Sequence, residues 1–178
     1  MALINTTTTG VLGTTLYGDG SGNLTVQKDG VTQGIYGNIP TFSVYKSVNQ
    51  TGLSNAVFTK VSWTVKEWDT NNNFDTTTNY RFTPTVAGYY QFNWELDTGG
   101  NTTSASLADL YKNGGTYKRG NGVFVASINE QYVCGSALAY ANGTTDYFEI
   151  YAYIAGGGTV YGNAVQYSYF QGVLVKAA

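Results

Sequence analysis

Apolar and polar residues alternate over short stretches of this chain, which is the pattern of half-buried β-strands. The clearest stretch is 88–96, where every second side chain points to the same face. The side chains expected to face the core are Tyr90, Phe92, Trp94 and Leu96, and those expected to face away are Tyr89, Gln91, Asn93 and Glu95. Four large side chains on one face predict a strand packed against a hydrophobic core.

Similar runs recur along the chain, separated by clusters of Gly, Asn, Asp and Thr, and helical periodicity is missing. Residues 41–47 alternate, and the best helical candidate, 104–113, reads equally well as a strand. In the run 57–67 the side chains expected on one face are Val57, Thr59, Val61, Trp63 and Val65. Short strands at regular spacing predict an all-β sandwich or barrel.

The last third of the chain adds three more expected strands. Residues 132–155 read as two strands around Asn142-Gly143, and Asn-Gly is the strongest short signal for a β-hairpin. The run 169–176 has Phe170, Gly172 and Leu174 on one face and Tyr169, Val173 and Val175 toward the other. A strand that is apolar on both faces needs a partner for its second face.

Aromatic residues are more numerous than one small sandwich can hide, with three tryptophans, eight phenylalanines and sixteen tyrosines. Tyrosine suits a surface that is apolar on one side and wet on the other, as a subunit interface is. Together with the two-faced last strand, this composition predicts self-association.

Residues 1–40 differ from the rest because they are rich in glycine and poor in large apolar side chains. They can form a small hairpin around residues 18–23 but offer little to build a core of their own. We therefore expect an extended arm, residues 1–40, that gains order by packing on a partner, and Pro40 marks its boundary with a domain of residues 41–178.

Charge and cysteine content exclude several classes of protein. Charged residues make up only 11% of the chain and the net charge is -2, which favours neither nucleic acid nor an anionic membrane as a partner. No secretory signal or membrane span is expected. The chain has no histidine, and its single cysteine, Cys134, rules out an intramolecular disulfide and is expected to be a buried thiol.

Catalytic and metal sites are not expected. Without histidine there is no Ser-His-Asp or Cys-His arrangement. Glu67 with Asp69, and Glu95 with Asp97, have the strand spacing of a carboxylate pair that could cleave a sugar, but solvated charges explain both pairs better. A calcium loop beginning Asp19-x-Ser-x-Asn lacks the later glycine and glutamate, so no metal or cofactor is expected.

One loop offers a candidate ligand site. Trp68 is followed closely by Asn71, Asn72 and Asn73. An aromatic ring can stack on a sugar ring while amides bond its hydroxyls, although a packed tryptophan beside a plain loop is the simpler interpretation.

Three separated segments resemble the globular-head family of the complement q subcomponent. Residues 73–94 resemble the family's signature of Phe-Thr-x-Pro followed by Gly-x-Tyr-x-Phe, 141–152 resemble its later strand entry, and 169–175 resemble its closing strand. The matching positions are Phe82, Pro84, Gly88, Tyr90, Phe92, Asp146, Phe148, Phe170, Gly172 and Leu174.

The resemblance implies a ten-stranded jelly roll related to tumour necrosis factor, which packs as a homotrimer. It also implies that the core and trimer motif comprises Tyr90, Phe92, Phe170, Gly172 and Leu174. The chain departs from the animal proteins because it lacks a collagen-like stem, a signal peptide and their cysteine pattern.

Taken together, these segments resemble the version of this domain that is found in bacteriophage structural proteins. We therefore expect a non-enzymatic virion surface protein, made in the host cytoplasm, whose residues 1–40 bind other virion proteins. It would serve either as a tail fibre or spike tip that attaches to a host glycan or receptor, or as a capsid decoration. The alternatives are a secreted lectin- or cytokine-like binding module and, less favoured, a sugar-cleaving enzyme.

Overall fold

A computed structural model describes residues 15–18, 24–28, 31–36, 39–100, 105–124, 130–163 and 166–178. The chain divides into two units, Met1–Asn38 and Ile39–Ala178. In the first unit three strands form an antiparallel sheet in the order β1 (Thr15–Gly18), β2 (Leu24–Lys28) and β3 (Val31–Tyr36). Strands β1 and β2 pair on either side of residues 19–23, and β3 is a strand that the sequence reading did not include. The calcium-loop residues between β1 and β2 lie outside the described residues.

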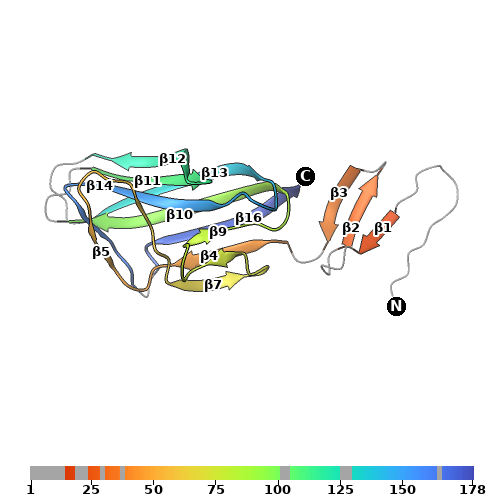
Figure 1. The fold of residues 1–178 in the computed structure, drawn as a ribbon, viewed down its shortest axis with the longest axis horizontal. Helices are drawn as coiled ribbons and strands as arrows, with labels where there is room; N and C mark the ends of the chain where they lie inside the picture. Colours follow the sequence, from red (N-terminus) through yellow and green to blue (C-terminus); the bar gives the residue numbers. More distant parts are fainter. Residues whose placement is uncertain are drawn as a thin grey trace. The chain divides into compact units, whose positions relative to one another are not determined.

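The second unit is built from two antiparallel sheets that lie face to face (Figure 1). We call them the β10 sheet and the β14 sheet. The β10 sheet has the order β5 (Gln50–Leu53), β15 (Gly158–Val160), β10 (Gly88–Gly99), β16 (Tyr169–Ala177), β4 (Thr41–Tyr45) and β7 (Val65–Asp69). Strand β13 (Gln131–Ala141) is also paired with β10. The β14 sheet has the order β12 (Gly115–Val123), β11 (Ala105–Lys112), β14 (Phe148–Ala155), β9 (Arg81–Phe82) and β8 (Phe74–Asp75), with β6 (Thr59–Lys60) also paired to β14. This architecture confirms the all-β class.

The alternation of residues 88–96 places the side chains as expected. Tyr90, Phe92, Trp94 and Leu96 are at most 1% exposed and form the central row of the core. Burial of large aromatic side chains is the main favourable contribution to such a core, at roughly 25 cal/mol per Å² of apolar surface. Strand β10 therefore supplies the central side chains that the β10 sheet packs into the core.

The motif residues of the last strand complete this core. Phe170 packs against Phe42 edge-on at a centroid distance of 5.0 Å, and Phe42 stacks on Phe82 at 4.3 Å. Gly172 lies opposite both Phe42 on β4 and Phe92 on β10, and a Cβ added there would come within 2.7 Å of each ring. Glycine is required at this position because the two rings occupy the space of a side chain.

Two details of the sequence reading are wrong. Asn142-Gly143 does not close a hairpin, because β13 pairs with β10 whereas β14 pairs with β11. The turn instead carries the chain from one sheet to the other, and the Asn142 Oδ1 atom accepts hydrogen bonds from the backbone N–H groups of Thr144, Thr145 and Asp146.

The run 57–67 is also not one continuous strand. Val61 and Trp63 are fully buried as expected, but they lie in an irregular segment between β6 and β7, and Val57 is 50% exposed. Within the run 104–113, by contrast, strand β11 covers Ala105–Lys112. No helix among the described ranges is long and apolar enough to cross a membrane.

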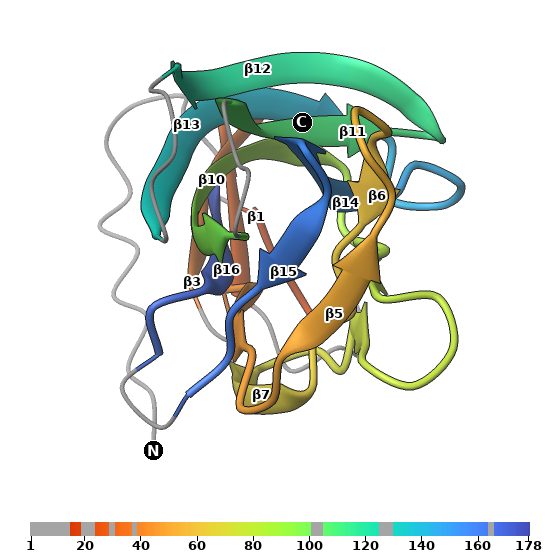
Figure 2. The same cartoon turned by 90° about the vertical axis from the view of Figure 1, so that its left-hand side faces the viewer.

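Strands β12 and β13 belong to different sheets but run side by side, so the sandwich nearly closes along this flank (Figure 2). The Asn121 Oδ1 atom accepts a hydrogen bond of 2.6 Å from the backbone N–H of Cys134. Gly120 permits the close approach, since a Cβ there would come within 2.5 Å of the Cys134 carbonyl oxygen and 2.6 Å of the Ala108 carbonyl oxygen. A side chain thus covers part of the edge of β13.

Candidate functional site

Large apolar side chains are exposed on the side of the β10 sheet that faces away from the core. This surface, which we call the outer face, lies on the three neighbouring strands β13, β10 and β16. Its exposed members, each 38–61% accessible, are Tyr89, Tyr132, Leu138, Tyr140, Val173 and Val175. Clustered exposed apolar side chains of this kind mark interaction surfaces in soluble proteins.

Strand register brings the outer-face residues into rows. Tyr89 lies opposite Tyr140, and Gln91 lies between Leu138 on one neighbouring strand and Val173 on the other. The Gln91 amide donates a 2.7 Å hydrogen bond to the Ser136 hydroxyl, so these two polar side chains are bonded to each other. The outer face therefore combines exposed apolar side chains with polar ones, of which Gln91 and Ser136 are bonded to each other.

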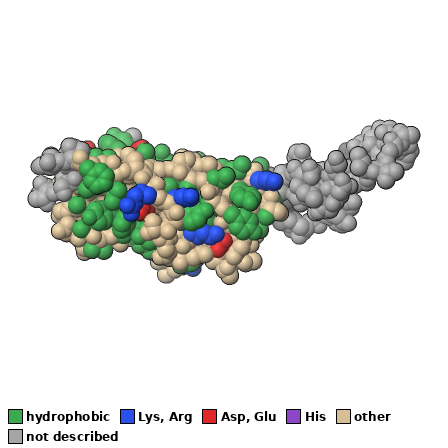
Figure 3. Space-filling model, turned by 90° about the horizontal axis from the view of Figure 1, so that it is seen from above, with side chains coloured by type: hydrophobic (Ala, Val, Ile, Leu, Met, Phe, Trp, Pro, Cys, Tyr) green, Lys and Arg blue, Asp and Glu red, His purple; other side chains and the backbone are tan. Residues whose placement is uncertain are grey.

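Cys134 lies on this exposed side, so the expectation of a buried thiol is wrong. The strand period explains the error: Val133 and the side chains at every second residue point into the core, which turns Cys134 outward opposite Glu95. On the face drawn in Figure 3, apolar and basic side chains are interspersed among uncharged polar ones.

One carboxylate on this side of the sheet is buried. Asp97 is 3% exposed, and its Oδ1 atom has no hydrogen-bond partner among the described residues. Burial raises the pKa of Asp97 to about 6, and the negative charges of Glu130 and Glu95 contribute to the increase. Neither of the two hollows described below includes Asp97 or Glu95. The second carboxylate pair considered for catalysis thus lies away from both of them.

A small hollow of about 150 Å³ lies beside Trp68. Trp68 is 43% exposed, and its indole N–H donates a 3.3 Å hydrogen bond to the Thr41 hydroxyl. The other lining residues come from β4, β10 and β16 and include Asn93 and Gln171. Trp68 therefore belongs to the exposed side of the β10 sheet.

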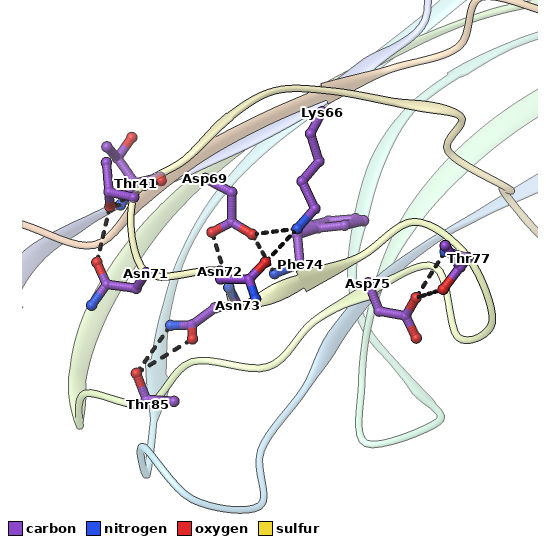
Figure 4. A network of polar contacts seen from close by, with 11 residues as sticks. Thr41, Lys66, Asp69, Asn71, Asn72, Asn73, Phe74, Asp75, Thr77 and Thr85 are labelled. Carbon is purple, nitrogen blue, oxygen red and sulfur yellow. Dashed lines mark hydrogen bonds and ion pairs between the residues drawn. The ribbon is translucent and has the colours of Figure 1, made fainter.

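A larger, open hollow of about 490 Å³ lies beyond the end of β7, and we call it the polar hollow. Its lining residues are Lys66, Asn72, Asn73, Phe74, Asp75, Thr76, Thr77, Thr83 and Thr85. Figure 4 shows the contacts around it. Hydroxyl, amide and charged groups predominate, and the buried ring of Phe74 lies among them.

Two aspartates hold the loops around the polar hollow. The Asp69 carboxylate accepts hydrogen bonds from the backbone N–H groups of Asn73 and Phe74 and forms an ion pair with Lys66 at 3.1 Å. The Asp75 carboxylate accepts bonds from the backbone of the turn that follows it, and the N–H groups of Thr77 and Thr78 hold the pKa of Asp75 well below its usual range. Both carboxylates therefore organise the backbone.

The far wall of the hollow is joined to these loops through Asn73. The backbone N–H of Thr83 donates to the Asn73 carbonyl oxygen at 2.8 Å. In the orientation that best satisfies its amide, Asn73 accepts from the Thr85 hydroxyl and backbone N–H at 3.1 and 3.2 Å and donates to the Asn71 carbonyl oxygen at 3.1 Å. The segments 66–77 and 83–85 thus form one connected rim.

The structure separates the residues of the sequence-predicted ligand site. Asn72 and Asn73 line the polar hollow, Trp68 lines the smaller one, and Asn71 lines neither. The sequence reading missed the four threonines of the polar hollow, although the run of threonines after Asp75 is a signal for a hydroxyl-rich turn. Of the first proposed carboxylate pair, Glu67 is exposed and Asp69 is engaged as described.

Comparison with known proteins identifies the fold. No family model and no curated protein matches the sequence. Among solved structures, the globular domain of zebrafish complement 1qA matches with a TM-score of 0.55 and 20% identity, covering 79% of this chain and 99% of that domain. Murine APRIL matches with a TM-score of 0.58 and 8% identity, covering 77% of this chain and 99% of that one. Eiger TNF from S. frugiperda matches with a TM-score of 0.60 and 12% identity, covering 79% of this chain and 95% of that one.

These matches confirm that the second unit has the jelly-roll fold of the complement 1q and tumour necrosis factor domains. The recognition based on residues 73–94, 141–152 and 169–175 is thus correct at the level of the fold. The expected motif residues Tyr90, Phe92, Phe170, Gly172 and Leu174 are all buried in it.

Proposed function

We propose that the chain is a non-enzymatic, homotrimeric binding module displayed on the surface of a bacteriophage particle. The outer face is the observation that carries the proposal, because six large side chains on one sheet remain exposed in the single chain. Association would remove this apolar surface from water. The resemblance to complement 1q and tumour necrosis factor jelly rolls supports three copies as the unit of assembly.

The carboxylates support a non-enzymatic role. Asp69 and Asp75 are both occupied by backbone N–H groups, and Asp97 is buried beside the sheet. A glycosidase needs two carboxyl groups that face one substrate across an accessible cleft. The polar hollow is lined by one carboxylate, Asp75, among threonine and asparagine side chains, and the smaller hollow is lined by no carboxylate.

On a particle, residues 1–40 would bind other virion proteins and residues 41–178 would face outward, either at a fibre or spike tip that attaches to a host glycan or receptor, or as a capsid decoration. Light scattering of the purified chain tests the assembly, with an expected mass of three times 19.1 kDa. Deletion of residues 1–40 should leave a trimer that no longer enters particles. A deletion variant that still enters particles would contradict the anchoring role.

A secreted lectin- or cytokine-like module is the second candidate, favoured by the similarity to murine APRIL and Eiger TNF. Both candidates use the same jelly roll and the same association surface. Detection of the chain by immunoelectron microscopy on purified phage particles would support the virion role. Its presence only in soluble culture supernatant would favour the secreted module.

A further inference from the structure

We propose that the polar hollow binds a neutral saccharide. The inference rests on the proposed function as a binding module and names the ligand class and the site. The hollow has a volume of about 490 Å³. Small-molecule sites in proteins usually fall between about 300 and 1,000 Å³. One or two sugar rings fit that space.

The charges around the hollow favour a neutral ligand. The ammonium group of Lys66 forms an ion pair with Asp69 at 3.1 Å and donates a hydrogen bond to the Asn72 Oδ1 atom at 2.8 Å, so its charge is compensated within the protein. The two oxygens of Asp75 already accept five hydrogen bonds from the side chains and backbone of Thr77, Thr78 and Asn79. An anion would lack a free cation here, and a metal ion would lack an open carboxylate.

Several uncharged groups remain free to bind a ligand. Thr76, Thr83 and Asn72 line the hollow, and neither the hydroxyls of the two threonines nor the side-chain N–H groups of Asn72 have a hydrogen-bond partner among the described residues. A hydroxyl both donates and accepts, and an amide N–H donates. Adjacent hydroxyl groups of a sugar also donate and accept, so this set matches a vicinal diol better than an apolar or charged ligand.

The rim is held in place before any ligand binds. Asp69 and Asp75 fix the two turns, and Asn72 adopts a φ of 53°, a conformation that asparagine tolerates better than most residues. A preorganised site avoids part of the entropic cost of binding. The Phe74 ring is 2% exposed and offers no face for stacking, so we expect weak, millimolar binding at each site. Three linked copies would raise the effective affinity.

The test is a titration of the ¹⁵N-labelled full chain with glucose, galactose, mannose and N-acetylglucosamine, followed by amide chemical shifts. We expect shifts in residues 72–85 with at least one of these sugars. The double variant Thr76→Val with Thr83→Val should weaken that binding about tenfold, since a hydrogen bond is worth roughly 0.5–1.5 kcal/mol. The single variant Thr83→Val serves if the double variant does not fold.

Thr78→Val is the matched control, because Thr78 is exposed in the same loop and does not line the hollow. It should bind like the parent chain. Three results would overturn the inference: no shifts in residues 72–85 with any of the four sugars, shifts only with N-acetylneuraminic acid or inorganic phosphate, or shifts centred on Trp68 that the variant Trp68→Ala abolishes.

Light scattering on the same samples separates this inference from the proposed function. A trimer that binds none of the sugars would overturn the saccharide site and leave the assembly intact. A monomer that binds sugar in residues 72–85 would overturn the trimer and leave the site intact.

Discussion

The rings of Tyr89 and Tyr140 meet edge to face across β10 and β13, with their centroids 5.5 Å apart, on the exposed side of the β10 sheet. Each ring restrains the other, yet both remain more than 40% exposed. Edge-to-face pairs contribute about 0.5–1.5 kcal/mol beyond the area they bury. The pair therefore presents a preformed apolar surface next to Leu138 and Val173.

Charge on the outer face should abolish association. We expect the double variant Leu138→Glu with Val173→Glu to scatter light as a 19.1 kDa monomer, because an interface would have to bury both unpaired carboxylates. Val48→Glu is the control, since Val48 is 58% exposed in the loop between β4 and β5 and is not on the three outer-face strands. A double variant with the mass of the parent would show that another surface mediates assembly.

Gly135→Ala should destabilise the fold. A Cβ at Gly135 would overlap the Trp94 ring, which is buried and whose indole N–H donates a 3.2 Å hydrogen bond to the Ala108 carbonyl oxygen. Overpacking of this kind costs about 1–3 kcal/mol of the free energy of unfolding. Urea denaturation measures the change, and Gly115→Ala is the control because the nearest atom there is 3.8 Å away. Equal stability of the two variants would contradict the packing of Trp94.

Asp97 should make the chain more stable in mild acid. Its pKa is raised from 3.8 to about 6, so between these values the folded chain keeps a proton that the unfolded chain has lost. The free energy of unfolding therefore falls as the pH rises through this window, by an amount on the order of 2–3 kcal/mol. Asp97→Asn should remove this contribution and raise stability at pH 7, measured by urea denaturation at constant protein concentration. An unchanged pH profile of stability in the variant would contradict the raised pKa of Asp97.

Lys46 should make the free energy of unfolding rise with pH in the alkaline range. It is 1% exposed, its ammonium donates to the Ser62 carbonyl oxygen at 2.6 Å, and burial lowers its pKa from 10.5 to about 8. Between these values the unfolded chain keeps a proton that the folded chain has lost, so the free energy of unfolding rises with pH. Lys46→Met should flatten the stability profile from pH 8 to 10. A variant that retains the parent's slope would locate the titrating group elsewhere.

The core could be predicted from the sequence because the strand period is local. Every second residue of 88–96 faces inward, and the same rule places Phe170, Gly172 and Leu174. The same rule applied to β13 would have turned Cys134 outward, but its apolar neighbours suggested burial instead.

Partners distant in sequence could not be predicted in this way. Asn142-Gly143 has the chemistry of a tight turn, but whether such a turn joins paired strands depends on which strands lie beside β13 and β14. Likewise Trp68 and Asn72 are close in sequence, yet the chain turns after β7 and sends them to different hollows. Thr83 reaches Asn73 only because the backbone between them folds back.

The contact between Asn121 and the backbone of Cys134 affects how copies of the chain can meet. An uncovered strand edge invites another strand to pair with it, and such pairing can repeat without limit. The amide of Asn121 takes the hydrogen bond that an incoming strand would need at this point. Pairing of a second copy along β13 is therefore blocked at Cys134, whereas the association through side chains that we propose for the outer face, which a closed symmetry would limit, stays open.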